Sequence, residues 1–258
     1  MSRLGNETSA LPAAVRRRMW WRLLGLQATW NQQRMQNVGL LVALGPWVDW
    51  RAVPAEERRR IARRYLGYFN TNPYLAPYVV GGLVRLEDER QRGGAVPDRL
   101  VIGFRDSLSR ACGAIGDQLF WLGMRPAVLA LAALAGWALA WWLAPLVIGV
   151  VAAGQLVMRW RGLDLGYRRG PDVVAVLERR AWHRAVAWTG RAALVLTGLL
   201  GGLFFAAVFA AGNEVDPLRV ASSVAVGLGI AVLLRPQRAG EVHFLAGVAL
   251  IAVLGLVI

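Results

Sequence analysis

The chain has 258 residues, 56% of them apolar, and its 30 basic residues, all arginine, outnumber 16 acidic residues to give a formal charge of +14. Soluble globular domains have only about 45–50% apolar residues, so this composition excludes an ordinary cytosolic domain. A single cysteine excludes an internal disulfide bond, and two histidines are too few and too far apart for a self-contained metal site. We therefore expect no metal ion and no cofactor.

The apolar excess lies mostly in uncharged runs of roughly twenty residues, the length that spans a bilayer as a helix. Arginines flank these runs, which favours positive-inside topology and contact with anionic lipids over nucleic-acid binding. Residues 1–10 are polar and lack the charged-then-apolar order of a cleavable signal. The sequence thus predicts an all-α integral membrane protein with broken helices, re-entrant hairpins, C-terminal transmembrane helices and an N-terminal interfacial amphipathic helix.

The first predicted region, residues 1–26, is an interfacial amphipathic arm. Between Leu11 and Leu26, four arginines accompany Trp20, Trp21 and several aliphatic side chains. Tryptophan and arginine together suit a helix that lies in the head-group layer of the membrane. The alternative is a charged flank that only orients the following segment.

The second region, residues 27–126, is predicted to be polar and re-entrant, with one cytoplasmic helix. Asn37 to Trp50 contains an apolar stretch that is interrupted by Gly45 and Pro46 and is too short to span the membrane. Ala55 to Tyr65 predicts a wetted cytoplasmic helix, because Pro54 suits its start and acidic residues precede the arginines, as the helix dipole favours.

Three further predictions concern the rest of this region. Tyr65 to Leu86 contains asparagines and prolines that break a helix, which is tolerated at membrane depth only where protein or a water-filled cavity satisfies the backbone. Glu87 to Arg99 is charged and contains two glycines and a proline, which predicts an exposed turn. Ala111 to Met124 is a 14-residue, weakly polar insert, a length that favours a re-entrant hairpin over a span.

The third region, residues 127–258, is predicted to be the hydrophobic transmembrane region. Residues 127–158 are uncharged and would form a helix of about 48 Å, longer than a bilayer core of about 30 Å. We expect a hairpin divided near Pro145, with one kinked, tilted helix as the alternative. Flanking arginines place both of its ends in the cytoplasm. A cytoplasmic loop at 159–191 and spans at 192–212, 218–234 and 242–258 then put the N-terminus inside and the C-terminus outside.

Polar residues near the start of the second region form the first candidate site. Asn31 and Arg34 share a face of a predicted helix with Gln27 and Val38, at spacings of four, three and four residues. Asn31 and Arg34 are therefore candidates for substrate binding or subunit contact. The alternative is that they are the ordinary polar residues of a helix at the interface.

The second candidate site surrounds Asp117 and Gln118 in the predicted re-entrant insert. A carboxylate near the membrane interior is costly and usually faces a bundle interior or a cavity. The nearest arginines are seven and eight residues away, not the three or four of a helical ion pair. If the insert is helical, Asp117 needs a partner from another segment or another chain; the alternative is a helix cap. Asn70 and Asn72 are candidate ligands or turn formers.

Conventional enzyme signatures are absent from the sequence. A phosphate loop ending in Gly-Lys-Ser or Gly-Lys-Thr cannot occur without lysine, and no second intramembrane carboxylate accompanies Asp117 for acid–base work. His183, His243 and Cys112 are expected to be structural. We therefore predict a chain that is not catalytic by itself.

Five segments of the sequence carry a family resemblance. They resemble, in the family's order, motifs of the IID membrane subunit of mannose/fructose/sorbose-family sugar phosphotransferase systems, and together they extend over about residues 20–175. The five segments are Gln27–Gly39 (QATWNQQRMQNVG), Phe69–Tyr74 (FNTNPY), Leu86–Arg90 (LEDER), Gly113–Trp121 (GAIGDQLFW) followed by Arg125-Pro126, and Arg159–Tyr167 (RWRGLDLGY).

The resemblance implies a role in sugar transport across a bacterial inner membrane. In such systems the IIC and IID subunits form a multi-copy membrane carrier for a hexose-type sugar. A cytoplasmic IIB protein, phosphorylated on histidine by IIA, passes its phosphate to the sugar. IID itself is not phosphorylated, which agrees with the lack of catalytic motifs. The resemblance implies that the arginine-rich cytoplasmic segments, Arg58 to Arg64 and Arg159 to Arg184, dock IIB; the alternative is that positive-inside topology alone produces them.

Departures from the family pattern leave an alternative function open. Gln33 stands where the family commonly has glutamate, Arg110-Ala-Cys112 replaces a usual Pro-Leu-Ala, and Gln118 replaces a smaller residue. Losing a carboxylate at position 33 would remove an ion-pair partner of an arginine. The alternative is therefore a degenerate, non-transporting regulatory or scaffold membrane subunit of a phosphotransferase system.

Overall fold

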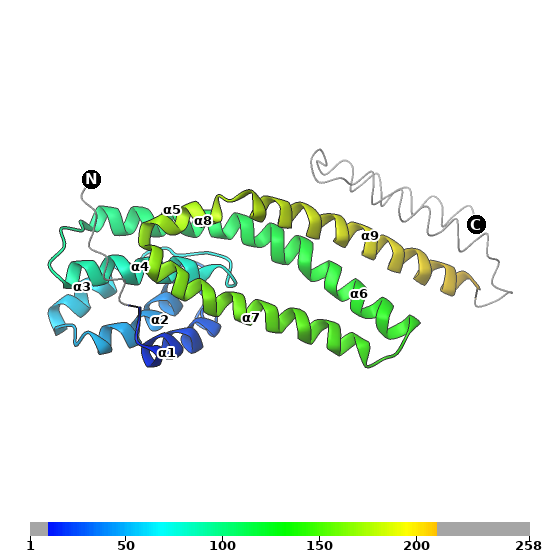
Figure 1. Ribbon diagram of the computed structural model, residues 1–258, viewed down its shortest axis with the longest axis horizontal. Helices are drawn as coiled ribbons and strands as arrows, with labels where there is room; N and C mark the ends of the chain where they lie inside the picture. Colours follow the sequence, from blue (N-terminus) through cyan, green and yellow to red (C-terminus); the bar gives the residue numbers. More distant parts are fainter. Residues whose placement is uncertain (1–9, 211–258) are drawn as a thin grey trace. The chain divides into compact units, whose positions relative to one another are not determined.

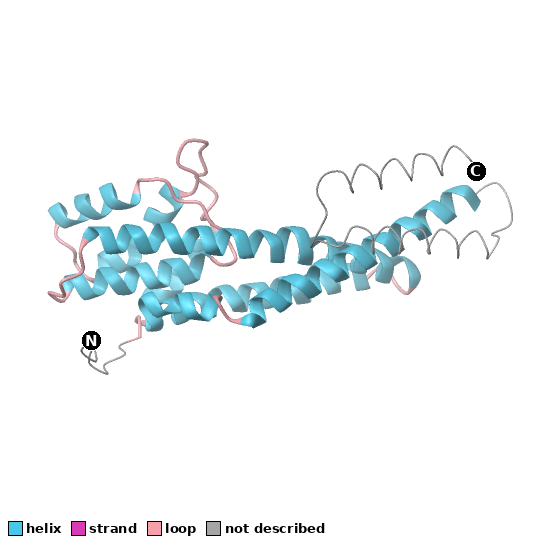
Figure 2. Ribbon diagram, turned by 90° about the horizontal axis from the view of Figure 1, so that it is seen from above, coloured by secondary structure: helices cyan, strands magenta, loops and turns pink. Residues whose placement is uncertain are grey.

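The computed structural model describes residues 10–210, which are mostly helical (Figure 2). Among these residues the chain forms two compact units. The polar unit comprises residues 10–117 and 152–182, and the apolar unit comprises residues 118–151 and 183–210. The elements in chain order are α1 Ala13–Leu24, α2 Asn37–Trp50, α3 Ala55–Tyr65, α4 Ala76–Gln91, α5 Asp98–Gly116, the π-helix η1 Asp117–Met124, α6 Arg125–Ala138, α7 Leu143–Arg169, the short 3-10 helix η2 Gly170–Asp172, α8 Val173–Leu177 and α9 Arg180–Ala210.

Helix α1 confirms the amphipathic helix predicted near the N-terminus. Its apolar stripe, Val15, Met19 and Leu23, recurs every four residues and is buried, as a helix face requires. This stripe packs within the polar unit, where α1 lies against α2 (Figure 1). The apolar face is thus occupied by protein, and a position of α1 in the head-group layer remains a prediction.

Helix α2 runs without interruption through Pro46, one of the two residues that interrupt the apolar stretch in the sequence. A proline inside a helix frees the carbonyl four residues earlier, here that of Val42. Arg22 Nη1 donates a hydrogen bond to this carbonyl over 3.0 Å. A tertiary contact from α1 therefore satisfies the group that would otherwise favour ending the helix.

Helix α3 begins and ends at the predicted residues, Ala55 and Tyr65. Pro54 precedes it, Glu56 and Glu57 lie in its first turn, and the basic residues of its last turn lie at the opposite end. The prediction that this helix is simply a wetted surface is wrong for one face. Its buried face consists of Ile61, Arg64 and Tyr65.

The predicted helix break before α4 is confirmed, since residues 66–75 are irregular and α4 starts at Ala76. Pro77 lies in the first turn of α4, where a proline is tolerated because its missing N–H has no partner there. The predicted exposed turn from Glu87 is wrong at its start. Helix α4 continues to Gln91, and both Glu87 and Asp88 are buried; the irregular segment begins only at residue 92.

The predicted re-entrant hairpin at residues 111–124 is wrong. Helix α5 continues through η1 into α6, which gives 41 uninterrupted helical residues from Asp98 to Ala138. A weakly polar Gly/Ala segment contains no residue that must end a helix, and Pro126 lies where α6 begins. Residues 117–124 of this long helix widen into the π-helix η1. A π-helical segment inside an α-helix is often found at functional sites.

The hairpin predicted within residues 127–158 is confirmed, and the single kinked helix is wrong. Helix α6 ends at Ala138 and α7 starts at Leu143. Pro145 lies in the first turn of α7 rather than at the turn itself. The predicted loop at 159–191 is wrong as secondary structure, because α7 continues to Arg169 and α9 starts at Arg180.

Close contact between backbones joins α4 to α7 inside the polar unit. A Cβ atom on Gly81 would lie 2.4 Å from the Leu163 carbonyl oxygen, and one on Gly166 would lie 2.4 Å from that of Tyr78. Both distances are far below van der Waals contact, so only glycine permits this packing. The contact sets the last of the five family-like segments against α4.

Within residues 10–204, three helical segments are long and apolar enough to cross a membrane: Asp98–Ala138, Leu143–Leu177 and Arg180–Phe204. The last of these includes residues 192–204 of the span predicted at 192–212. The spans predicted at 218–234 and 242–258, and the position of the C-terminus, fall outside the described residues.

Candidate functional site

The segment with Asn31 and Arg34 is not the predicted helix. Helix α1 ends at Leu24 and α2 starts at Asn37, so the intervening residues form turns. Asn31 holds these turns: its Oδ1 accepts a hydrogen bond from the Arg34 backbone N–H over 2.8 Å, and its Nδ2 donates to Asn37 Oδ1 over 3.1 Å. The side-chain amide competes with helical backbone bonds, which explains the failed prediction.

This turn segment packs against the irregular segment that follows α3. The Gln36 side chain donates to the Thr71 carbonyl over 2.9 Å and accepts from the Thr71 N–H over 3.1 Å. Arg34 Nη1 donates to the Leu66 carbonyl over 3.1 Å. The Gln36 backbone N–H donates to the Phe69 carbonyl over 2.8 Å. Two segments without regular secondary structure thus form hydrogen bonds with each other's backbone groups.

Asn72 connects the same place to the end of α5. Its Nδ2 donates to Asp117 Oδ1 over 3.0 Å, and its Oδ1 accepts from the Tyr74 N–H over 3.0 Å. Gly116 allows the approach, because a Cβ there would lie 2.3 Å from the Asn72 Cβ. Asp117 therefore does have a partner from another segment, and Asn72 is both a turn former and that partner.

We call the meeting place of residues 27–36, residues 66–75 and the C-terminal end of α5 the loop junction. Arg34, Asn70 and Asp117 are exposed there, Asn31 is half-buried, and Asn72 is buried. Gln118 follows directly in η1 and is exposed, but it belongs to the apolar unit. Five of the six candidate residues thus lie in or beside one set of hydrogen-bonded segments.

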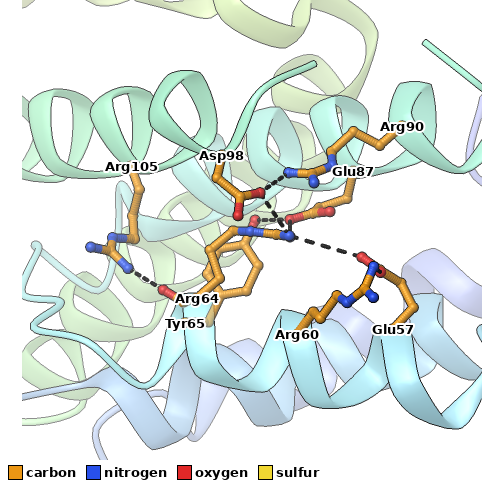
Figure 3. Close-up of polar contacts among 8 residues, drawn as sticks. All are labelled: Glu57, Arg60, Arg64, Tyr65, Glu87, Arg90, Asp98 and Arg105. Carbon is orange, nitrogen blue, oxygen red and sulfur yellow. Dashed lines mark hydrogen bonds and ion pairs between the residues drawn. The ribbon is translucent and has the colours of Figure 1, made fainter. Parts of the chain in front are cut away.

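Sequence reasoning missed two buried ionic networks that also lie in the polar unit. In the first, Arg64 of α3 forms an ion pair with Glu87 of α4, and the Tyr65 hydroxyl donates to the same carboxylate over 2.8 Å (Figure 3). Arg64 also lies 3.0 Å from Asp98 Oδ1, and Arg105 donates to the Arg64 carbonyl over 2.6 Å. The network therefore joins α3, α4 and α5.

Burial and charge explain the protonation of this first network. Burial and the neighbouring Glu87 carboxylate together raise the pKa of Tyr65 well above its ordinary value, which keeps its hydroxyl as a donor. Burial alone would lower the pKa of Arg64, but Glu87 outweighs it and raises that pKa. Arg64 and Glu87 thus face each other as a charged pair.

The second network surrounds Asp88. Arg51 binds both carboxylate oxygens, one of them over 2.6 Å, while Trp47 Nε1 and the Tyr167 hydroxyl donate over 3.3 and 2.8 Å. Burial would raise the pKa of Asp88, but these hydrogen bonds outweigh it and lower that pKa. Arg92 lies 3.1 Å away as a further cation. The carboxylate is thus charged and links α2, α4 and α7.

Both networks hold helices together. Their charged and hydroxyl groups bind one another, while the Arg64 Nε and Glu87 Oε2 atoms are buried without a hydrogen-bond partner. Within the described residues, no group of three histidine, cysteine or carboxylate side chains is placed to hold a metal ion. The sequence signal for these networks was the position of Glu87 and Asp88 directly after the apolar residues of α4, without an intervening turn residue.

The fold and these sites define the class of protein: it is a helical membrane protein with a polar, internally hydrogen-bonded unit. The family model of the PTS system mannose/fructose/sorbose family IID component matches residues 10–210. Because this match covers most of the sequence, the chain belongs to that family.

Curated relatives agree with the family assignment. The PTS system mannose-specific EIID component of Escherichia coli (strain K12) is 33% identical over 152 residues, which are 57% of this chain and 53% of that protein. The sorbose-specific EIID component of Lacticaseibacillus casei is 31% identical over 152 residues, 57% of this chain and 52% of that protein. The chain thus spans about half the length of these curated relatives.

Solved structures share the fold. A cryo-EM structure of the mannose transporter ManYZ in complex with microcin E492 contains a chain with a TM-score of 0.59 and 21% identity, and the match covers 96% of this chain and 97% of that one. A second solved structure, titled only as a membrane protein, matches with a TM-score of 0.72, 22% identity and the same coverage.

The structure also brings the five family-like segments together inside the polar unit, apart from residues 118–121 of the fourth. Gln36 of the first segment binds Thr71 of the second, and Asn72 of the second binds Asp117 of the fourth. Asp88 of the third accepts from Tyr167 of the fifth. These bonds join the first, second and fourth segments to one another and, separately, the third to the fifth. The Arg159 guanidinium of the fifth segment, 5.9 Å from the centre of the Tyr74 ring of the second, links the two groups.

Proposed function

We propose that this chain is the IID subunit of a membrane sugar carrier that, with a IIC subunit, translocates a hexose-type sugar as a phospho-IIB partner phosphorylates it. The observation that supports this most directly is the family match over residues 10–210. The connected contacts among the five segments add to it, because they give the family motifs a common structural purpose.

In this proposal the chain is a non-phosphorylated, non-catalytic member of a multi-copy complex in the bacterial inner membrane. It crosses the membrane several times, with its N-terminus in the cytoplasm. Arginine-rich stretches beside the spans keep that side inside and contact anionic lipids. IIB, itself phosphorylated by IIA, approaches from the same side.

The loop junction is the part of the chain that we assign to the sugar or to the IIC subunit. Arg34 and Asn70 expose donors that the local turns do not consume fully, and Asp117 exposes a carboxylate that Asn72 orients. Amide, guanidinium and carboxylate groups are the usual partners of sugar hydroxyls and of polar subunit contacts. Asn31 and Asn72 hold the segments in place, and Gln118, in η1 of the apolar unit, stays a candidate on the basis of the sequence.

The experiment is uptake of labelled hexoses by cells that carry this chain together with its neighbouring phosphotransferase genes. We expect Asp117→Asn to abolish uptake or assembly with IIC, because the amide cannot replace the charge. Asp172→Asn, at an exposed carboxylate of η2, is the matched control and should leave uptake unchanged. Unchanged uptake in Asp117→Asn would remove Asp117 from the site.

The same cells test the alternative of a non-transporting regulatory or scaffold subunit. That alternative draws on the departures Gln33 and Arg110, which are exposed, and Cys112, which is buried. It predicts co-purification of the unaltered chain with phosphotransferase components but no sugar uptake. Uptake that depends on the chain would exclude it.

A further inference from the structure

The turn between α6 and α7 carries an unusual concentration of exposed tryptophan. Trp137, Trp141 and Trp142 lie within six residues of each other, and their exposed fractions are 62%, 79% and 52%. Leu139, between them, is 77% exposed. We call residues 137–142 the tryptophan tip; all of it lies in the apolar unit, and Figure 1 shows the turn between α6 and α7 that contains it. Large apolar side chains of this kind are normally buried, so the tip needs a partner.

The length of α7 indicates where the tip lies in a membrane. Helix α7 carries no charge between Trp142 and Arg159, which are 17 residues apart. This is about 25 Å of helix, close to the hydrocarbon thickness of about 30 Å. When Arg159 lies near one surface of the bilayer, the tryptophan tip therefore reaches the head-group layer of the other.

The backbone of the tip supports the same depth. The N–H groups of Leu139 and Ala140 both donate to the Ala135 carbonyl, at 3.1 and 3.2 Å, where α6 ends. The last turn of any helix leaves carbonyls without partners in the helix. Lipid tails cannot satisfy such groups, whereas water and lipid head groups can. A turn in the middle of the bilayer would leave these carbonyls without hydrogen-bond partners, which costs free energy. A turn at the bilayer surface avoids this cost.

Tryptophan is the side chain that best suits this layer, because its ring is apolar and its indole N–H needs an acceptor. We propose that the tryptophan tip is a membrane anchor that sits in the head-group layer on the side opposite Arg159. The rings lie among the upper acyl chains and the indole N–H groups donate to lipid carbonyl or phosphate oxygens. This proposal is independent of sugar transport.

The depth of the tip can be measured with nitroxide labels on the full chain in vesicles of phosphatidylcholine and phosphatidylglycerol. Leu139→Cys places a label in the tip, and Val150→Cys places one at an exposed site in the uncharged stretch of α7. Cys112 is fully buried, so the unaltered chain serves as the control for background labelling. Collision with oxygen and with a water-soluble nickel chelate then reports the depth of each label.

We expect the label at Leu139 to lie at the lipid phosphates and the label at Val150 about 12 Å deeper, from the helical rise between Trp142 and Val150. Equal depths for the two labels would overturn the proposal. So would a label at Leu139 that is shielded from both probes, since this would mean that a protein partner covers the tip.

A substitution series tests the role of the indole groups. Replacing Trp137, Trp141 and Trp142 together by phenylalanine keeps aromatic rings but removes the N–H donors. We expect the label at Leu139 to move deeper into the acyl chains. Trp188→Phe, at an exposed tryptophan of α9, is the matched control and should leave that depth unchanged. An unchanged depth in the triple variant would show that the indole N–H groups do not anchor the tip.

Discussion

The polar and apolar units use opposite means to become stable. The polar unit buries charges and pairs them internally, as Glu87 with Arg64 and Asp88 with Arg51 show. The apolar unit exposes large apolar side chains along α6 and the start of α7, as Leu129 and Ile148 show. In water the second arrangement would be unfavourable, because exposed apolar surface costs about 25 cal/mol per Å².

The contrast shows where each unit finds its stabilising surroundings. The contacts of the polar unit are within its own helices, so its stability depends on pairs such as Arg64–Glu87. The exposed faces of the apolar unit are matched to lipid or to partner helices. Substitutions inside the polar unit should therefore affect folding strongly, and small changes on open faces of the spans should be mild. The following predictions test this difference in order of expected effect.

The largest effect is expected from Arg64→Leu. The substitution leaves the Glu87 carboxylate buried without its cation, which costs about 3–5 kcal/mol of unfolding free energy. Chemical denaturation in detergent measures it. Arg63→Leu removes an exposed neighbour on the same helix and should change stability by less than about 0.5 kcal/mol. Equal effects of the two variants would contradict the buried pair. Adding Glu87→Leu to Arg64→Leu should recover much of the loss, because an apolar pair replaces an unpaired charge.

The next effect is expected from Tyr167→Phe. It deletes the hydroxyl that donates to Asp88 and should cost about 1.5–3 kcal/mol at neutral pH, as for hydrogen bonds to charged groups. Tyr68→Phe is the control, since Tyr68 is exposed and its substitution should be nearly neutral. The same denaturation measurement applies. A loss no larger than that of the control would show that the hydroxyl contributes nothing to the link between α4 and α7.

Two glycines of α7 give a matched comparison within one helix. Gly166→Ala forces a Cβ against the Tyr78 carbonyl and should destabilise by about 1–3 kcal/mol. Gly154→Ala meets no atom within 4 Å and should stabilise slightly, by up to about 1 kcal/mol, because alanine favours the helix. Effects of the same sign at the two positions would contradict the division into a packed and an open stretch.

The smallest effect is expected in the pH dependence of the unfolding free energy. Asp88 has a lowered pKa when folded, so its stabilisation is complete above its ordinary pKa, near 3.8, and is lost as the pH falls through the folded value. Tyr167→Phe brings the folded pKa back toward the ordinary one. The destabilisation caused by Tyr167→Phe should therefore shrink when denaturation is repeated below about pH 3.8. A difference that does not change with pH would exclude this linkage to Asp88.

Local signals predicted some elements to the residue. Pro54 and the first-turn acids determine where α3 starts, and these effects act within one turn of the helix. The hairpin at 127–158 followed from length together with the arginines that flank both ends, because the run is too long for one straight span and positive charge favours the cytoplasmic side. Where the predicted helix at residues 27–38 failed, a local side chain decided: Asn31 accepts from the Arg34 backbone N–H and folds its segment into turns.

The candidate site was predictable in composition but not in arrangement. Asn31, Arg34, Asn70 and Asn72 could be selected because polar residues stood out from apolar surroundings. Nothing in the spacing showed that Asn72 would reach Asp117, because the two are 45 residues apart.

The amino-acid sequence alone thus determined which stretches suit a membrane, where charge gathers, and which family this chain joins, since these properties depend on residue type and local order. Only the tertiary structure decided which charges are buried and which residues meet. The physical reason is that a carboxylate such as Glu87 is stable either in water or beside a buried cation, and the cation comes from a helix 23 residues away.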